Sequence, residues 1–264
     1  MLENNRRKEG LEESKLLIAK IKDKINISKK TNKIVNTDFL DMSELSLVKN
    51  FFKEEKIDTF YIYGVREEAD RNIVIFYPEK FSEDMIVKNL KNIIEIIRID
   101  FPNNTNFEHR EILSGVMKLG VKREKFGYIT VNENFAQIVV LKEIADYIIN
   151  NLKQLTRFRR CSLELVQIND FVSKENEYEE FSIIISSNRL DNFVSELAKC
   201  SRNMASEYIK QGKVFINSIN KYKDAKKINL NDIITIRGKG KFIYTGIQKE
   251  TKSGRLLVDI KKYK

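Results

Sequence analysis

The residues that most often build metal sites and catalytic triads are scarce in this chain. Its 264 residues include two cysteines, one histidine and no tryptophan. Cys161 and Cys200 are far apart and lack the paired spacing of zinc ligands. His109 is the only histidine for a Ser/His/Asp triad or a thiol–histidine pair. We therefore predict no metal site, no cofactor and no catalytic residue of these kinds.

Long apolar runs are missing as well. No stretch approaches the ~20 apolar residues that span a bilayer. The first residues, MLENNRRKEGLEESK, lack the apolar segment and small-residue cleavage site of a secretory signal. Hydrophobic residues still make up 42% of the chain, which is enough for ordinary cores. We expect a cytoplasmic protein of two or three small domains with no membrane partner.

Positive charge is concentrated in the last third of the chain. The whole sequence has a net charge of +10, with 48 Lys and Arg against 38 Asp and Glu. Residues 182–264 hold 18 basic and 7 acidic residues, so residues 1–181 hold 30 and 31. A basic module beside nearly neutral domains is typical of proteins that bind polyanions. On charge alone, a basic surface without a ligand is the alternative.

Residues 1–90 predict a small domain of helices and one hairpin. The stretch 11–25 places apolar residues on one helical face, and 43–55 predicts a second helix with Ser43 as its N-cap. Two strands follow in DTFYIYG and NIVIFYP, joined by a charged turn. No residue pattern in this segment predicts a catalytic or ligand-binding site.

Residues 91–180 predict the element order βαββαβ, which is the ferredoxin-like order that RNA recognition domains share. The strands are NIIEIIRIDF, FGYITV, FAQIVVL and RRCSLELVQI, and the helices are FEHREILSGVMKLG and KEIADYIINNL. Tyr128 and Phe135 are able to stack on bases, although packing is the commoner role for such rings. The acidic stretch NDFVSKENEYEEF predicts a linker near 168–181. The whole chain is thus predicted to be α+β and multi-domain.

Residues 182–264 predict two short helices followed by a small sheet. Ser187 or Asn188 is a suitable N-cap for a helix that runs through Lys199 along one apolar stripe. Ser201 caps a second helix, and Gly212 ends it. Strands follow in KVFIN, NLNDIITIRGKGKFIYTG and RLLVDIKKY.

Polar and basic side chains gather around these helices, and we predict that they bind RNA. They are Arg189, Lys199, Arg202, Asn203, Ser206, Lys210 and Lys213, joined by Arg237, Lys239 and Lys241 from the flexible loop RGKGKF. Long cations on preformed helices suit a curved phosphate backbone. The loop has neither the length nor the Ser/Thr of a Walker phosphate loop, so it does not predict nucleotide hydrolysis.

Two parts of the chain resemble known families. The stretch RLDNFVSELAKCSRNMASEYIKQGKVFIN, with NDIITIRGKGKF, resembles the S-four domain, the RNA-binding module named after small-subunit ribosomal protein four. Ser218 stands where that family often has glycine. FEHREILSGVMKLGVKREKFGYITV and FYIYGVREEADRNIVIFYP resemble the bacterial YlmH family, in which an acidic residue is expected in place of Tyr128. The resemblance implies an N-terminal domain (1–90), a ferredoxin-like, RRM-like domain (91–180) and an S-four-type domain (182–264).

The same resemblance implies a non-enzymatic protein in quality control of stalled ribosomes. Its S-four domain would contact ribosomal RNA and peptidyl-tRNA on the large ribosomal subunit, and the chain would be a monomer off the ribosome. An RNA-modifying enzyme, foremost a pseudouridine synthase, is the alternative, with Asp191 as its aspartate. That aspartate lies inside the predicted binding module, and the sequence holds no second Arg-Leu-Asp. A scaffold that uses the middle domain to bind a protein partner is a third possibility, and it is compatible with the RNA-binding reading.

Overall fold

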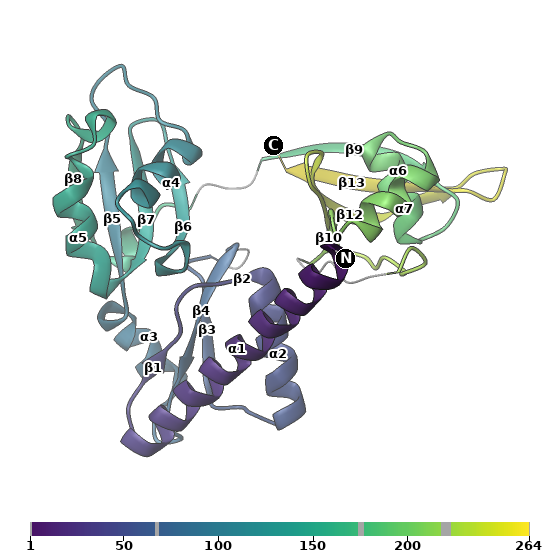
Figure 1. Cartoon of the computed structure of the whole chain (residues 1–264). Helices are drawn as coiled ribbons and strands as arrows, with labels where there is room; N and C mark the ends of the chain where they lie inside the picture. Colours follow the sequence, from purple (N-terminus) through teal and green to yellow (C-terminus); the bar gives the residue numbers. More distant parts are fainter. Residues whose placement is uncertain (1, 67–68, 174–176, 218–222, 264) are drawn as a thin grey trace. The chain divides into compact units, whose positions relative to one another are not determined.

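The computed structural model describes residues 2–66, 69–173, 177–217 and 223–263, with the backbone alone for 2–11 (Figure 1). The chain forms two compact units, residues 1–174 and 175–264. Helices and antiparallel sheets occur in both, which confirms the α+β, multi-domain prediction. Ser218 lies outside the described residues. The predicted boundary between 90 and 91 falls inside the first unit, so the three-domain division stays a prediction.

The first half of unit one is a small sheet covered by two helices. Its strands pair in the order β1-β4-β2, with β3 also pairing with β4. The elements are α1 (Leu2–Thr31), β1 (Val35–Asn36), β2 (Leu40–Asp41), α2 (Met42–Glu55), β3 (Phe60–Tyr63), β4 (Arg71–Phe76), α3 (Glu83–Asn89) and η1 (Leu90–Asn92). Ile21, Val48 and Phe76 are buried between the helices and the sheet.

The N-cap of α2 is Asp41, so the prediction of Ser43 is wrong. The Asp41 carboxylate accepts a hydrogen bond from the Glu44 backbone N–H at 2.9 Å, and the Glu44 carboxylate accepts one from the Asp41 N–H at 2.7 Å. This reciprocal pair is a capping box. Because Asp41 also ends β2 in an extended conformation, the helix starts directly from the strand, two residues earlier than predicted.

The second half of unit one has the predicted ferredoxin-like arrangement. Its strands lie in the order β6-β7-β5-β8 and are all antiparallel, which confirms the βαββαβ prediction. The elements are β5 (Ile94–Asp100), α4 (His109–Lys118), η2 (Arg123–Lys125), β6 (Phe126–Val131), β7 (Phe135–Leu141), α5 (Lys142–Leu152), η3 (Thr156–Phe158), β8 (Ser162–Val166) and η4 (Ile168–Asp170). Helices α4 and α5 cover one face, where Ile97, Ile112 and Ile148 are buried.

The other face of this sheet packs against the N-terminal half of the unit. Ile96 and Val139 from the sheet share a buried cluster with Phe39 and Ile75. RNA recognition domains stack bases on this face. Tyr128 belongs to the same cluster, and its hydroxyl accepts a hydrogen bond from Arg66 at 3.0 Å. Tyr128 is therefore a packing residue, and most of this face is closed to bases.

The C-terminal unit is a five-stranded antiparallel sheet with two helices on one face. Its strands lie in the order β10-β11-β12-β13-β9. The elements are β9 (Tyr178–Ile185), α6 (Leu190–Ala198), α7 (Arg202–Lys210), β10 (Val214–Ile216), β11 (Ile233–Ile236), β12 (Gly240–Glu250) and β13 (Leu256–Tyr263). Phe193, Ile209 and Val258 are buried between helices and sheet.

Residues 178–181, predicted as part of a linker, are the first half of β9. This strand pairs with β13 along its whole length. Its two consecutive glutamates lie opposite lysines, with Glu180 at 2.9 Å from Lys261 and Glu179 at 3.7 Å from Lys262. Cross-strand pairs of opposite charge support a strand that would be unfavourable alone. The acidic composition therefore marks an edge strand and not only a linker.

Candidate nucleic-acid interface

Helix α6 begins one or two residues later than predicted, because its first N–H groups bind another part of the chain. The Leu190 N–H donates to the Lys226 carbonyl at 2.8 Å, and the Asp191 N–H donates to the Asp224 carbonyl at 3.2 Å. Arg189 is the N-cap residue and makes no side-chain cap. The predicted caps Ser187 and Asn188 are therefore wrong. Lys199 lies just past the helix, in a left-handed conformation with φ of 52°.

Asp191 and Arg189 form a two-pronged ion pair. The Arg189 Nε donates to Asp191 Oδ1 at 3.0 Å and its Nη2 donates to Oδ2 at 2.9 Å. The Asn192 N–H also donates to Oδ1, at 3.1 Å. Burial raises the pKa of the Asp191 carboxyl, but the Arg189 hydrogen bonds and charge, with smaller help from Asn192 and Arg202, leave it below its ordinary value. Asp191 is 8% exposed. Its two carboxylate oxygens accept the hydrogen bonds that hold Arg189 in place.

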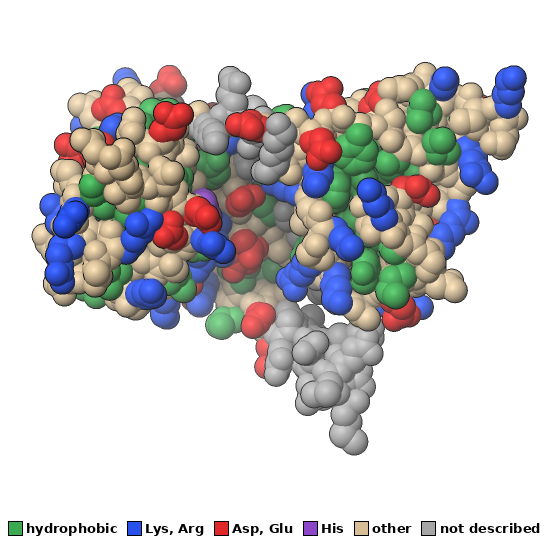
Figure 2. Space-filling view, turned by 90° about the horizontal axis from the view of Figure 1, so that it is seen from above, with side chains coloured by type: hydrophobic (Ala, Val, Ile, Leu, Met, Phe, Trp, Pro, Cys, Tyr) green, Lys and Arg blue, Asp and Glu red, His purple; other side chains and the backbone are tan. Residues whose placement is uncertain are grey.

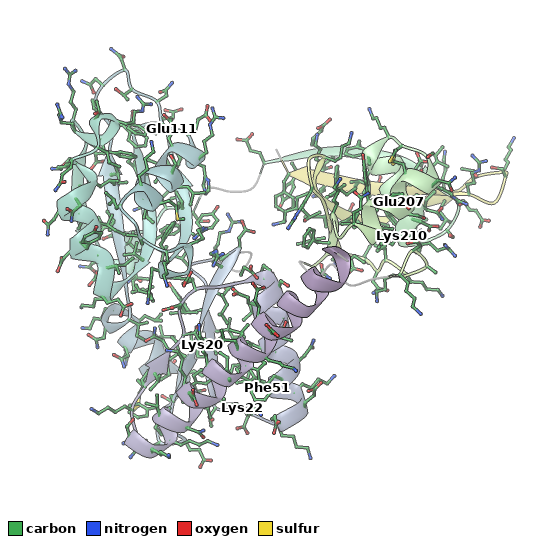
Figure 3. All side chains as sticks on the ribbon, viewed as in Figure 1. Lys20, Lys22, Phe51, Glu111, Glu207 and Lys210 are labelled. Carbon is green, nitrogen blue, oxygen red and sulfur yellow. The ribbon has the colours of Figure 1, made fainter. Side chains whose placement is uncertain are left out.

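Helix α7 carries the predicted polar residues on its solvent side. The Ser201 hydroxyl accepts a hydrogen bond from the Met204 N–H at 3.3 Å, which confirms the predicted cap. Arg202, Ser206 and Lys210 recur every four residues and therefore lie on one face. Arg202 and Lys210 are exposed, Ser206 is half-buried and Asn203 is exposed beside them. Figure 3 shows Lys210 and Glu207 on this helix. The Lys210 ammonium is 3.6 Å from the Glu207 carboxylate.

Arg202 also borders a hollow next to α6. Its guanidinium donates to the hydroxyl of Ser186, at the end of β9. The hollow has a volume of about 360 Å³ and is lined by Ile184, Ile185, Ser186, Asn192, Ser195, Glu196, Arg202 and Arg255. Arg255 comes from the turn between β12 and β13, and the sequence did not predict it as a site residue. The charges of Arg189 and Arg202 both lower the pKa of the Asp191 carboxyl.

The loop RGKGKF forms a tight hairpin between β11 and β12. Strands β11 and β12 pair as far as Ile236 and Gly240, and only three residues connect them. The Lys239 N–H donates to the Ile236 carbonyl at 2.9 Å. Gly238 and Gly240 have φ of 77° and 134°, a region that strongly favours glycine. The two glycines thus allow the backbone to make this turn.

The ten predicted residues do not form one cluster. Arg189, Arg202, Asn203, Ser206 and Lys210 belong to the helices, with Lys199 in the connection between them. The Lys213 ammonium lies 5.5 Å from the centroid of the Tyr208 ring, near the end of α7. The Lys239 charge partly offsets the rise that burial causes in the pKa of Cys200, which lies between the helices. Arg237 and Lys241 instead lie over the rings of Phe215 and Tyr263. They belong to the opposite face of the sheet.

Within the described residues, no three His, Cys, Asp or Glu side chains are arranged to hold a metal ion. The helices of the same residues include none whose length and hydropathy would allow it to cross a membrane. Figure 2 shows Lys and Arg side chains spread among hydrophobic ones on the surface of the C-terminal unit. The Lys and Arg ammonium and guanidinium groups and the amides of this surface can bind anionic ligands.

Two family models match parts of this chain, and two known proteins are similar to it. Residues 91–170 match the family described as "Putative RNA-binding domain in YlmH", and residues 188–219 match "S4 domain". The chain is 25% identical over 233 residues to "Ribosome-associated protein quality control protein P2" of Bacillus subtilis (strain 168), covering 86% of this chain and 87% of that protein. A solved structure, "Cell division protein ylmH from Streptococcus pneumoniae", is 23% identical with a TM-score of 0.47, covering 61% of this chain and 95% of that one. Residues 91–170 and 188–219 are thus similar to the putative RNA-binding domain of YlmH and to the S4 domain, which confirms the resemblance seen in the sequence.

Proposed function

We propose that this chain is an RNA-binding protein that associates with the ribosome and acts in the quality control of stalled nascent chains. The observation that carries the proposal is the exposed face of α7, where Arg202, Ser206 and Lys210 recur at helical spacing inside an S-four-type domain. Arg189, at the start of α6, is already fixed by Asp191. The name of the Bacillus subtilis relative, a ribosome-associated quality control protein, supports the same function.

Phosphate contacts would supply most of the affinity. The α7 face offers two long cations, a hydroxyl and an amide, which are the groups that proteins use on phosphate and sugar oxygens. Such contacts release counterions, so binding should weaken steeply with salt. The arrangement positions the protein on an RNA surface by shape and charge. It offers few groups for reading a base sequence.

The family resemblance supports the finer part of the proposal. It indicates ribosomal RNA and peptidyl-tRNA on the large subunit as the partners, in the cytoplasm, with the chain a monomer when it is off the ribosome. We also propose that the chain has no catalytic activity of its own, since the relatives' printed names describe RNA binding and quality control.

Co-sedimentation with ribosomes tests the proposal. The double variant Arg202→Glu/Lys210→Glu reverses both cations of the α7 face and should no longer sediment with large subunits. Lys49→Glu/Lys53→Glu is the matched control, because it makes the same charge change on the exposed side of α2. We expect the control to sediment like the wild type. Sedimentation of the α7 variant with unchanged affinity would remove the α7 face from the proposal.

A pseudouridine synthase would need a reactive aspartate, and the geometry does not favour Asp191. Its carboxylate is bound on both oxygens by Arg189 and is largely buried. Uridine isomerisation in ribosomal RNA can be compared between a deletion strain and its parent. Loss of a specific pseudouridine, restored by wild type and not by Asp191→Asn, would establish the enzyme instead.

A further inference from the structure

The sheet of the C-terminal unit has a second face, opposite α6 and α7. Buried and half-buried residues alternate along its strands: Ile234 and Ile236 are buried, whereas Ile233 and Thr235 are not. The same alternation runs through β10, where Phe215 is half-buried between two buried residues. The buried set packs under the helices. Because side chains of a strand alternate between faces, the other set lies on the side away from the helices.

One row of this second face carries aromatic rings from one edge of the sheet to the other. Phe215 of β10 pairs with Thr235 of β11, and Thr235 pairs with Lys241 of β12. The Lys241 ammonium lies 4.6 Å from the ring centroid of Tyr263 on β13. Tyr263 pairs with Tyr178 of β9, and their ring centroids are 5.0 Å apart. With about 4.8 Å between strands, the row spans about 19 Å.

Each ring of the row lies beside a cation. The Arg237 guanidinium is 5.0 Å from the centroid of Phe215, and the Lys261 ammonium is 5.7 Å from that of Tyr178. Lys261 also pairs with Glu180 at 2.9 Å. Aromatic rings interleaved with cations combine the two interactions that hold single-stranded nucleic acids.

We propose that this row, Phe215–Thr235–Lys241–Tyr263–Tyr178, is a second RNA-binding surface that takes a single-stranded segment. The bases stack on the three rings, and the phosphates face Arg237 and Lys241. Stacking needs unpaired bases, because the bases of a duplex are already stacked on one another. The charge complementarity favours RNA over an apolar protein partner, since cations stand between and beside the rings. The surface is separate from α7, whose cations suit the backbone of a folded RNA.

Binding of short oligonucleotides to the full chain tests the proposal. The probes are fluorescein-labelled oligouridine and oligoadenosine of ten nucleotides, and a ten-base-pair RNA duplex, followed by fluorescence anisotropy. We expect Tyr178→Leu/Tyr263→Leu to weaken binding of both single strands at least tenfold and to change duplex binding less than twofold. Tyr178→Phe/Tyr263→Phe keeps the rings and should keep the affinity. An unchanged affinity in the leucine variant, or equal loss in the phenylalanine variant, would overturn the stacking surface.

The matched control is Tyr147→Leu, the same change at a tyrosine of α5 that is 49% exposed in the other unit. It should leave oligonucleotide binding unchanged. A second measurement avoids dependence on the folding of variants: 4-thiouridine in the oligouridine is photocrosslinked to the wild type. Crosslinks within 178–185 or 256–263 support the proposal. Crosslinks confined to α6 and α7 overturn it.

The outcome is distinguishable from that of the ribosome proposal. The variant Arg202→Glu/Lys210→Glu should lose ribosome co-sedimentation and keep oligouridine binding within twofold. If it loses both, the oligonucleotide lies on the helices and the second surface is wrong. If the wild type never sediments with ribosomes while oligonucleotide binding still depends on the two tyrosines, the second surface stands alone.

Discussion

Arg189 and Asp191, two residues apart, are joined by two parallel hydrogen bonds of 3.0 and 2.9 Å at the start of α6. The pair fixes an exposed guanidinium before any ligand arrives. A side chain that is already ordered loses less conformational entropy when it binds. In this Arg-Leu-Asp tripeptide the aspartate therefore holds the arginine side chain in place, and we expect it to contribute to RNA binding through Arg189.

Replacing Asp191 by Asn should destabilise the C-terminal unit. The amide keeps the shape but loses the charge that holds Arg189, and we expect a cost of about 1–2 kcal/mol because the arginine is partly exposed to water. Urea unfolding followed by circular dichroism measures it. Glu196→Gln, an exposed carboxylate on the same helix, should change stability by less than about 0.5 kcal/mol. Equal effects of the two variants would contradict the role given to Asp191.

The stability contributed by Asp191 should depend on pH. Its pKa is lower in the folded chain than in the unfolded chain, so the unfolded state takes up the proton first as the pH falls. The contribution is complete above the ordinary carboxyl pKa of about 4 and is lost as the pH drops through the lower folded value. The difference in unfolding free energy between wild type and Asp191→Asn should therefore shrink below about pH 4. A difference that stays constant down to pH 3 would be incompatible with the ion pair.

Gly127→Ala should loosen the contact between the two halves of unit one. A Cβ at Gly127 would lie 2.5 Å from Cε1 of the Phe39 ring, which is 1% exposed and has no room to move. Overpacking of this kind costs about 1–3 kcal/mol. Gly246→Ala is the control, since a Cβ there meets nothing within 4 Å. Calorimetry should show a lower melting temperature for Gly127→Ala alone, and an unchanged one would mean that the ring and strand are not in tight contact.

His109 should titrate below its ordinary pKa. Partial desolvation lowers the pKa most, the Arg123 charge lowers it further, and the Asp70 charge opposes them. It is the only histidine, so one ring resonance followed by NMR reports it directly. We expect Arg123→Gln to raise the pKa and Asp70→Asn to lower it. Because the unfolded chain binds this proton more readily, stability should fall as the pH drops through about 6.5. Shifts of the same sign in both variants would contradict these assignments.

Local patterns in the sequence predicted the elements whose causes are local. The βαββαβ order follows from apolar periodicity, and the strand order β6-β7-β5-β8 is the usual outcome of that order. The Ser201 cap and the left-handed Gly212, with φ of 66°, depend on neighbouring residues alone. The buried residues Ala205 and Ile209 of α7 follow from the 3.6-residue period.

The errors concern features whose causes lie far along the chain. The first N–H groups of α6 bind the carbonyls of Asp224 and Lys226, which no reading of residues 186–190 reveals. The sequence did not predict the first half of strand β9, because the lysines of β13 that form ion pairs with its glutamates lie about 80 residues further along the chain. The alternation of Phe181, Ile183 and Ile185 was a signal for this strand that the acidic composition obscured. The sequence also does not show which face of a hairpin a residue occupies, and the structure places Arg237 and Lys241 over the rings of Phe215 and Tyr263.

The packing of β4 and Phe39 on the sheet of β5 to β8 has a consequence for how such proteins change over generations. A gene rearrangement that separated residues 1–90 from 91–170 would uncover Ile96, Val139 and their neighbours, and the orphaned sheet would expose an apolar surface prone to self-association. The two segments are therefore expected to be inherited together. The unit at 175–264 has its own core, so a recombination event that lost it or joined it to another protein would leave both products able to fold.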